Sequence, residues 1–187
     1  MLGNISLDWK NHWGVNALSA TLLAEYQKRK VAAFWTQVKG LTNNNFGYDN
    51  LAAGSDRPYG GTGSSYADPS LTSFMGTLSY TLLDRYTLNL TTRADGSSMV
   101  GKDHTWGIFP SISASWDLKK ERFLRNCNTI SLLNLRTGYG RSGNLGGISS
   151  YLTLRQYIPV GLVPYNGTHT VTMGTLRNSN PALRWET

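Results

Sequence analysis

Side chains that could carry out catalysis or bind a metal ion are few in this sequence and lie far apart. The three histidines, His12, His104 and His169, have no carboxylates at the spacing of a metal site. Asp103 and His104 lie near Ser97, but no Gly-x-Ser-x-Gly turn exposes a serine there as a nucleophile. The residues therefore predict a protein that is not an enzyme and that carries neither a metal nor a cofactor.

The single cysteine, the glycine pairs and the net charge add no further site. Cys127 alone gives neither a disulfide framework nor a thiolate metal site. Gly60-Gly61 and Gly146-Gly147 lack the strand-to-helix context of a phosphate-binding loop, so we interpret them as flexible loop positions. The net charge of +7 comes from scattered basic residues, with local clusters at Lys28-Arg29-Lys30 and Lys119-Lys120 that we interpret as solvated loops rather than nucleic-acid contacts.

The elements that must position the polar residues are strands, because apolar and polar side chains alternate with period two. Between Leu71 and Leu82 the apolar or small residues fall on one phase and the hydroxyl residues on the other. The alternation resumes from Tyr86 to Asp95 and again from Trp106 to Leu118. Trp106 and Trp116 lie at the two ends of the third strand, where two membrane interfaces would select indole rings.

Strand length separates a membrane barrel from a soluble sandwich. Successive strands here keep their alternation over roughly the 9 to 11 tilted residues that cross a bilayer in a β-barrel. No apolar run reaches the roughly 18 residues of a transmembrane helix. The sequence therefore predicts an all-β fold, a partial antiparallel transmembrane β-barrel that is a slice of a large barrel with long extracellular loops.

The other strands and loops follow from the same alternation. Ile5, Leu7 and Trp9 predict a first strand, which a polar turn at Lys10 to Gly14 ends. Leu18 to Tyr26 predicts the next strand. The remaining expectations are an extension of that strand over Val31 to Val38, a long extracellular loop over Gly40 to Ser70, a helical turn at Glu121 to Leu124, a strand over Leu133 to Tyr139, a long outer loop over Ser142 to Asn180 with a strand around Tyr151 to Tyr157, and a new strand from Leu183 to Thr187.

Short motifs follow one another in order along most of the chain. They are Ser73-Phe74, Asp84-Arg85-Tyr86, Arg93-Ala94-Asp95-Gly96-Ser97-Ser98, Trp106-Gly107-Ile108-Phe109-Pro110-Ser111, Ala114-Ser115-Trp116, Leu135-Arg136-Thr137-Gly138-Tyr139-Gly140, Ser142-Gly143-Asn144 and Asn180-Pro181-Ala182-Leu183-Arg184-Trp185-Glu186-Thr187. Together these motifs resemble the SusC/RagA family of TonB-dependent receptors, which are outer-membrane transporters.

The resemblance implies an importer of oligosaccharides or peptides in the outer membrane of a Gram-negative, Bacteroidota-like bacterium. Such an importer is energised by TonB and works with a SusD-like surface lipoprotein as its lid. Family members also carry a signal peptide, a TonB box and a plug domain, none of which is visible here. We therefore expect residues 1–187 to form a partial barrel domain of about seven strands.

Four charged residues are predicted to face the lumen of the barrel: Arg85, Arg93, Asp95 and Arg136. A buried guanidinium needs partners, so the arginines could pair with plug carboxylates, with Asp95 or Glu25, or with substrate. We favour pairing with the plug or within the lumen. Asp95-Gly96 is interpreted as a turn at the end of a strand, since glycine accepts a positive φ.

Aromatic side chains in the predicted outer loops are candidates to stack on sugar rings or to contact the lipoprotein lid. They are Tyr59, Tyr66, Tyr151 and Tyr157. The alternative to an importer is a soluble β-rich carbohydrate-binding or adhesin module, and a passive porin is a third possibility. A soluble module would leave Leu88, Leu90 and Ile108 exposed to water, which favours the membrane barrel.

Overall fold

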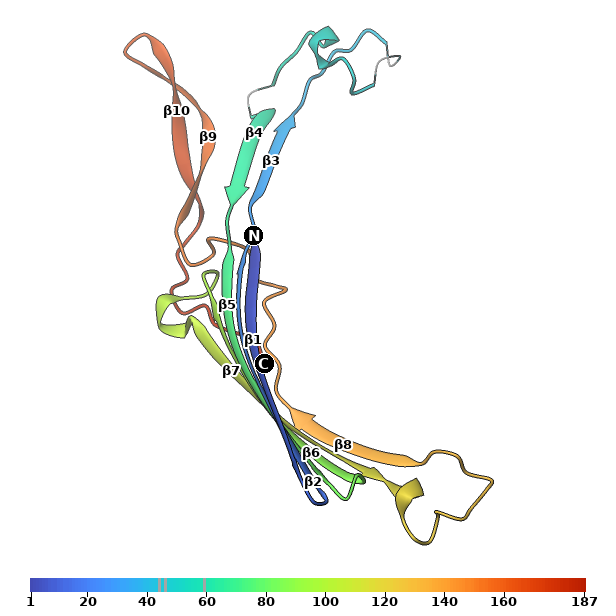
Figure 1. Cartoon of the computed structure of the whole chain (residues 1–187). Helices are drawn as coiled ribbons and strands as arrows, with labels where there is room; N and C mark the ends of the chain where they lie inside the picture. The colour runs from blue at the N-terminus through green and yellow to red at the C-terminus, as the bar shows by residue number, and fades with distance from the viewer. Residues whose placement is uncertain (44, 46, 59) are drawn as a thin grey trace.

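The computed structural model describes residues 1–43, 45, 47–58 and 60–187, and strands are its main element. They form one six-stranded sheet and two separate two-stranded hairpins, all with antiparallel pairing (Figure 1). In the part of the chain that the structure describes, the large sheet ends at β1 on one side and β8 on the other. The sheet is an open, twisted wall, which confirms the predicted all-β slice of a barrel.

The six strands of the wall lie in the order β1-β2-β5-β6-β7-β8. Their bounds are β1 Leu2–Trp13, β2 Asn16–Lys28, β5 Ser70–Leu82, β6 Tyr86–Ser97, β7 Trp106–Asp117 and β8 Asn134–Gly140. The first five have 12 or 13 residues each, which is enough to cross a bilayer at a tilt.

The register carries the period-two pattern across the sheet. Leu78 pairs with Leu90, and Leu90 with Ile112, so one face is apolar from strand to strand. One residue away, Thr77 pairs with Thr91, and their hydroxyl oxygens lie 3.2 Å apart. Because successive side chains point to opposite faces, each strand contributes to both an apolar and a polar face.

Two short turns close one end of the wall, which we call the turn end, and the opposite end is the hairpin end. Gly14, Leu83 and Asp84 all have positive φ there. The predicted turn at Lys10 to Gly14 is wrong in its start, because β1 continues to Trp13, which pairs with Asn16. Cross-strand pairing satisfies the backbone of the polar residues before it and so overrides their low strand preference.

The predicted turn at Asp95-Gly96 is also wrong, since β6 runs through both residues to Ser97. Asp95 pairs with Ser73 on β5 and with Gly107 on β7, so ladder hydrogen bonds on both sides keep the chain extended. The chain leaves the sheet after Ser97, before the short helix η2 at Lys102–His104.

Both hairpins stand beyond the hairpin end of the wall (Figure 1). In the first, β3 Val31–Thr36 pairs with β4 Thr62–Ala67, so the predicted loop Gly40 to Ser70 contains a strand. Between them lies the short helix η1 at Leu51–Ala53. The predicted extension over Val31 to Val38 is found, but it ends at Thr36.

The second hairpin pairs β9 Gln156–Tyr165 with β10 Thr168–Arg177. The prediction of a strand around Tyr151 to Tyr157 therefore starts too early, since the strand begins at Gln156. Tyr151 itself lies in a turn with a φ of 67°. The predicted strand over Leu183 to Thr187 is also wrong, because the segment forms no strand and its pairing there is an isolated bridge between Glu186 and Asn144.

The connection from β7 to β8 begins with the short helix η3 at Leu118–Lys120. The turn predicted at Glu121 to Leu124 follows it, with the Arg125 N–H donating to the Glu121 carbonyl at 2.8 Å. Among the described residues, the buried apolar side chains are Val100, Phe109 and Ile148. Most other large apolar side chains lie exposed on one face of the wall or on the hairpins.

Candidate functional site

The apolar face of the wall is bounded by a stacked aromatic pair at each end. At the hairpin end the rings of Phe74 and Trp106 lie 5.9 Å apart, and at the turn end those of Tyr86 and Trp116 lie 6.0 Å apart. Aromatic rings at both edges of an apolar band are typical of a lipid-facing barrel surface. Trp106 and Trp116 therefore occupy the two ends that the sequence predicted.

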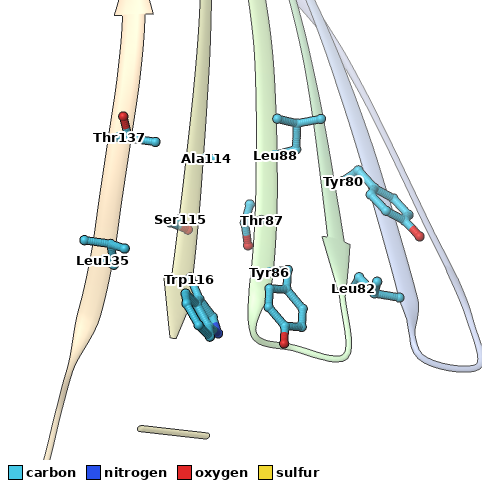
Figure 2. A pocket seen from close by; sticks show the side chains of 10 residues that line it. All are labelled: Tyr80, Leu82, Tyr86, Thr87, Leu88, Ala114, Ser115, Trp116, Leu135 and Thr137. Carbon is cyan, nitrogen blue, oxygen red and sulfur yellow. The ribbon is translucent and has the colours of Figure 1, made fainter. Parts of the chain in front are cut away.

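A groove of about 580 Å³ lies on the apolar face near the turn end. Figure 2 shows the aliphatic and aromatic side chains that line it: Tyr80, Leu82, Tyr86, Leu88, Trp116 and Leu135. They come from four neighbouring strands, and all lie on the apolar phase of the register. This arrangement suits acyl chains, and nothing in it supplies the convergent polar groups of a substrate site.

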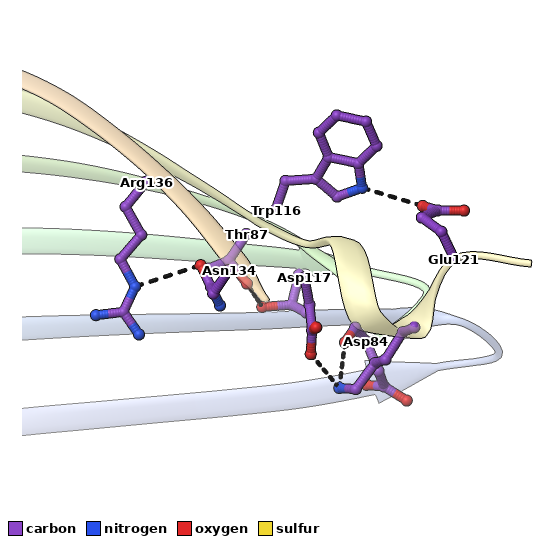
Figure 3. A network of polar contacts seen from close by, with 9 residues as sticks. Asp84, Thr87, Trp116, Asp117, Glu121, Asn134 and Arg136 are labelled. Atoms are coloured by element: carbon purple, nitrogen blue, oxygen red, sulfur yellow. Dashed lines mark hydrogen bonds and ion pairs between the residues drawn. The ribbon is translucent and has the colours of Figure 1, made fainter. Parts of the chain in front are cut away.

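Glu121 fixes the aromatic pair of the turn end. Its carboxylate accepts hydrogen bonds from the Tyr86 hydroxyl at 2.6 Å, the Trp116 indole at 3.0 Å and Arg85 Nη1 at 2.9 Å. The bond to Trp116 is drawn in Figure 3. The hydrogen bonds from Tyr86 and Trp116 hold the pKa of Glu121 below its ordinary value. A charged carboxylate here orients the polar edges of both rings.

Two of the predicted lumen-facing arginines lie near the turn end. Arg85 is a turn residue whose guanidinium pairs with Glu121, next to the aromatic pair. Arg136 lies on β8, on the polar phase, and its Nε donates to Asn134 Oδ1 at 3.3 Å (Figure 3). The polar face beside them carries Asp117, whose carboxylate lies 3.5 Å from the Lys120 ammonium.

The other predicted pair, Arg93 and Asp95, lies on the polar face at the hairpin end. Arg93 Nε donates to both carboxylate oxygens of Asp95 at 2.8 and 2.9 Å. Its Nη2 reaches the Ser73 hydroxyl on the neighbouring strand at 3.1 Å. The Asp95 side chain is only 10% exposed, so this guanidinium compensates a largely buried charge.

Motifs that are far apart in the sequence meet beside this pair. The Trp185 ring contacts the buried Phe109 ring edge-on, with centroids 5.3 Å apart. The Trp185 indole donates to the Thr105 carbonyl at 3.2 Å. We call the group the polar-face cluster and define it as Arg93, Asp95, Phe109, Asn144, Trp185 and Glu186.

Backbone pairing ties the end of the chain into the polar-face cluster. Asn144 N–H donates to the Glu186 carbonyl at 2.9 Å, and the Asn144 side-chain amide donates to the Glu186 carboxylate at 3.3 Å. Gly101 N–H donates to the Leu183 carbonyl at 2.8 Å. The strand predicted at Leu183 to Thr187 is replaced by these contacts, which hold its side chains over the wall.

Close packing requires glycine at two positions, Gly143 in a motif and Gly101 between two motifs. A Cβ on Gly143 would overlap the ring of Phe109, and one on Gly101 would overlap the Pro181 carbonyl oxygen. Neither glycine has a positive φ, so a larger residue is excluded at these positions by lack of space and not by backbone conformation. Gly143 therefore lets its segment lie against Phe109 on β7, and Gly101 lets the β6–β7 connection lie against the segment at Pro181.

A cavity of about 480 Å³ opens between the polar-face cluster and the wall. Its lining combines apolar side chains with two guanidinium groups and one carboxylate: Leu71, Met75, Phe109, Leu145, Trp185, Arg93, Arg141 and Asp95. Arg141 Nη2 donates to the Thr187 hydroxyl at 3.3 Å. A mixed apolar and charged hollow can receive a polar group of a neighbouring domain or of a small ligand.

The described candidate tyrosines come from three different segments of the chain. Tyr59 lies outside the described residues, Tyr66 is on β4 and Tyr157 is on β9. The Tyr151 hydroxyl donates to Asp68 at 3.2 Å, and Asp68 also pairs with Lys28 at 3.0 Å. Hydrogen bonds from Lys28 and, secondarily, Tyr151 hold the pKa of Asp68 below its ordinary value.

Within the described ranges, no three His, Cys, Asp or Glu side chains gather as metal ligands. The same ranges contain no helix of the length and apolarity needed to span a bilayer. Cys127 is a free thiol whose pKa is lowered by hydrogen bonds from the backbone at Thr129 and Ile130.

A sheet with one apolar face between aromatic pairs and one polar face is the wall of a transmembrane β-barrel. Residues 2–187 match the family described as TonB dependent receptor-like, beta-barrel. The chain belongs to this family of TonB-dependent receptors, and its resemblance to SusC/RagA proteins is confirmed by its relatives.

Two curated relatives and one solved structure illustrate the match. The chain is 35% identical to TonB-dependent receptor P26 of Formosa agariphila over 164 residues, which are 88% of this chain and 16% of that one. It is 39% identical to TonB-dependent receptor SusC of Bacteroides thetaiotaomicron over 122 residues, 63% of this chain and 12% of that one. The chain thus spans less than a fifth of these relatives.

The solved structure of the RagAB peptide transporter aligns with a TM-score of 0.76 over 98% of this chain and 20% of that chain. At 20% sequence identity this match shows the fold.

Sequence reasoning missed Glu121 as a side chain that binds both rings, and it missed the pairing of Asn144 with Glu186. Glu121 is the single acidic residue between Leu118 and Asn128, just beyond Trp116, which is the signal that was available. Asn144 and Glu186 carry no local signal, because their contact depends on how two loops return to the wall.

Proposed function

We propose that this chain forms part of the barrel wall of a TonB-energised importer of the SusC/RagA type in a Gram-negative outer membrane. The observation that carries the proposal is the two-faced wall, with an aromatic pair at each end of its apolar face. The importer takes up oligosaccharides or peptides together with a SusD-like lipoprotein lid. The wall itself has no enzymatic activity and supplies lumen surface and outer segments.

The polar face is the lumen face in this proposal. Arg93, Asp95 and Arg136 lie on its phase, while Arg85 lies in the turn beside it. Arg93 and Asp95 neutralise each other, which leaves the cavity at the polar-face cluster to contact the plug domain or substrate. The long hairpins extend on the extracellular side, where Tyr66, Tyr151 and Tyr157 are available to the lid or to substrate.

Neighbouring positions on β6 test the orientation of the wall. Leu88 lies on the apolar phase and Asn89 on the polar phase, so Leu88→Cys and Asn89→Cys differ in the face that they label. Both are made in the complete receptor with Cys127→Ser, because the lowered pKa of the native thiol would favour its own labelling. A water-soluble maleimide applied to outer-membrane vesicles should label the Asn89→Cys variant, while the bilayer protects the Leu88→Cys variant until detergent is added.

The soluble-module alternative predicts equal labelling of both positions without detergent, and that result would contradict the membrane assignment. Import itself is tested in a strain that lacks the receptor. The complete gene should restore uptake of a labelled oligosaccharide or peptide only when TonB is present. Uptake that persists without TonB would indicate a passive pore.

A further inference from the structure

The second hairpin is joined to the rest of the chain by two anchored segments. Before β9, the side-chain amide of Asn144 donates to the Glu186 carboxylate, and after β10 the Leu183 carbonyl accepts the Gly101 N–H. Tyr151 lies between Asn144 and β9, and its side chain reaches the base of the first hairpin. The segment that enters the second hairpin is therefore in direct contact with the first one.

Tyr151 has a backbone conformation that a bulky residue rarely adopts. Its φ is 67°, in the left-handed region, and a residue strained in this way persists only where its surroundings hold it. The Tyr151 carbonyl accepts the Leu154 N–H at 3.0 Å and the side-chain amide of Gln156, the first residue of β9, at 3.3 Å. Its hydroxyl donates to Asp68 Oδ1 at 3.2 Å. The strained residue is thus bonded to Asp68 through its side chain and to the start of β9 through its backbone.

Asp68 lies at the base of the first hairpin, between the end of β4 and the start of β5. Because Pro69 follows it, Asp68 is confined to extended backbone, which limits the directions in which its carboxylate can point. On the other strand of the base, the Arg29 N–H donates to the Pro69 carbonyl at 3.0 Å. The junction that carries the Asp68 carboxylate is therefore fixed on both strands.

The two carboxylate oxygens of Asp68 hold different elements. Oδ2 pairs with the ammonium of Lys28, the last residue of β2, at 3.0 Å, and Oδ1 accepts the Tyr151 hydroxyl. The Lys28 and Asp68 side chains are 36% and 35% exposed, and an ion pair at such a site contributes little stability by itself. Its effect here is to orient an ionised acceptor, which strengthens the hydrogen bond from Tyr151.

We propose that Asp68 is a latch that joins the bases of the two outer hairpins, with Lys28 on one side and Tyr151 on the other. While both contacts are made, Tyr151 keeps its left-handed backbone and β9 starts from a fixed point. When the Tyr151 hydroxyl leaves Asp68, the backbone strain is relieved and the second hairpin is free to move relative to the first. The inference uses the proposed function only to place the hairpins on the extracellular side, since the contacts that carry it lie within the chain.

The contact between Tyr151 and Asp68 can be removed with little change in shape. Tyr151→Phe deletes the hydroxyl that reaches Asp68 and keeps the ring. Tyr157→Phe on β9 is the matched control, because the Tyr157 hydroxyl makes none of the contacts described above. Asp68→Ala removes the acceptor and should act in the same direction as Tyr151→Phe.

The distance between the hairpins is measured in the complete receptor, purified alone in detergent. Its native cysteines, Cys127 among them, are replaced by serine, and spin labels are attached at Ser65→Cys on β4 and Thr170→Cys on β10, two exposed positions. This labelled receptor is the background into which the three variants are introduced.

The labelled background and Tyr157→Phe should each give one narrow distribution of distances between the labels. We expect a distribution about twice as wide in Tyr151→Phe and in Asp68→Ala, because the second hairpin then moves independently. Amide exchange at Leu154, whose N–H bonds to the Tyr151 carbonyl, should become about tenfold faster in the same two variants.

Equal widths in the background, Tyr151→Phe and Tyr157→Phe, or equal broadening in the two Tyr→Phe variants, would overturn the latch. A background distribution already as wide as that of Asp68→Ala would also overturn it. If Asp68→Ala does not fold, the two Tyr→Phe variants decide the outcome by themselves. A receptor that imports nothing but shows the expected distances would overturn the proposed function alone, and one that imports while Tyr151→Phe changes no distance would overturn this inference alone.

Discussion

The indole of Trp185 meets the phenyl ring of Phe109 at an angle of 66°, with the ring centroids 5.3 Å apart. Phe109 lies on β7 of the wall, and Trp185 lies in the segment that returns after β10. The Thr105 carbonyl accepts the indole N–H, so the ring packs on the sheet without an unpaired donor. This contact holds the returning segment against the polar face.

A double-mutant cycle on Phe109 and Trp185 should show that the two rings act as a pair. We expect Phe109→Ala to lower the free energy of unfolding of the complete receptor by about 3 kcal/mol, because the ring is buried. The coupling energy with Trp185→Ala should be about 0.5 to 1.5 kcal/mol. Guanidinium unfolding of the four proteins in detergent measures it, and strictly additive losses would contradict the pairing.

Replacing Gly143 should disturb the same contact from the other side. The Cβ of Gly143→Ala would overlap the Phe109 ring, so we expect a loss of about 1 to 3 kcal/mol in the free energy of unfolding. Gly3→Ala on β1 is the matched control, since its Cβ would meet no atom within 4 Å. The control should change stability by less than about 0.5 kcal/mol. Equal effects of the two substitutions would show that packing on Phe109 is not the reason for Gly143.

Removing one partner of the ion pair between Arg93 and Asp95 should destabilise the receptor more than removing both. Arg93→Met leaves the nearly buried Asp95 carboxylate without its partner, and we expect a loss of about 1 to 3 kcal/mol. The double variant Arg93→Met with Asp95→Ala removes both charges and should recover much of that loss. Unfolding midpoints of the two variants test this, and a double variant less stable than the single one would contradict it.

The sequence predicted the wall because its strands are long and carry their own signal. Leu78, Leu90 and Ile112 alternate with hydroxyl residues, and this period is enough to place β5, β6 and β7 within one or two residues of their ends. The phase also separates the two faces before any pairing is known. What it cannot supply is where each strand stops, since Lys10 to His12 and Asp95-Gly96 stay extended only because neighbouring strands pair with them.

The hairpins and the polar-face cluster were harder to predict, for different reasons. Asn166-Gly167 between two apolar runs is a strong local hairpin signal. The prediction of a long loop over Ser142 to Asn180, with a strand around Tyr151 to Tyr157, overlooked it. By contrast, the contacts of Asn144 with Glu186 and of Phe109 with Trp185 join segments that are distant in the chain. The motifs carried the family resemblance, but their convergence is a property of the folded wall.

Glu121 should make the turn end of the wall sensitive to acid. Hydrogen bonds from Tyr86 and Trp116 hold the pKa of its carboxyl below the ordinary value of 4.5. A group with a lowered pKa in the folded state contributes stability above its unfolded pKa and loses it as the pH falls through the folded one. The contribution of Glu121 should therefore be complete above about pH 4.5 and decline below it.

The comparison of wild type with Glu121→Gln isolates this contribution from the other carboxyl groups. Glutamine keeps an acceptor for the Trp116 indole but has no charge to lose, so we expect the wild type to be more stable at neutral pH and the difference to shrink below about pH 4.5. Tyr86→Phe removes the largest cause of the lowered pKa. The stability difference between Tyr86→Phe and the double variant Tyr86→Phe with Glu121→Gln should therefore disappear at a higher pH than the difference between wild type and Glu121→Gln. Unfolding midpoints measured from pH 3 to pH 7, in about half-unit steps, follow both differences. A difference between wild type and Glu121→Gln that stays constant over this range would show that the charge of Glu121 does not stabilise the aromatic pair.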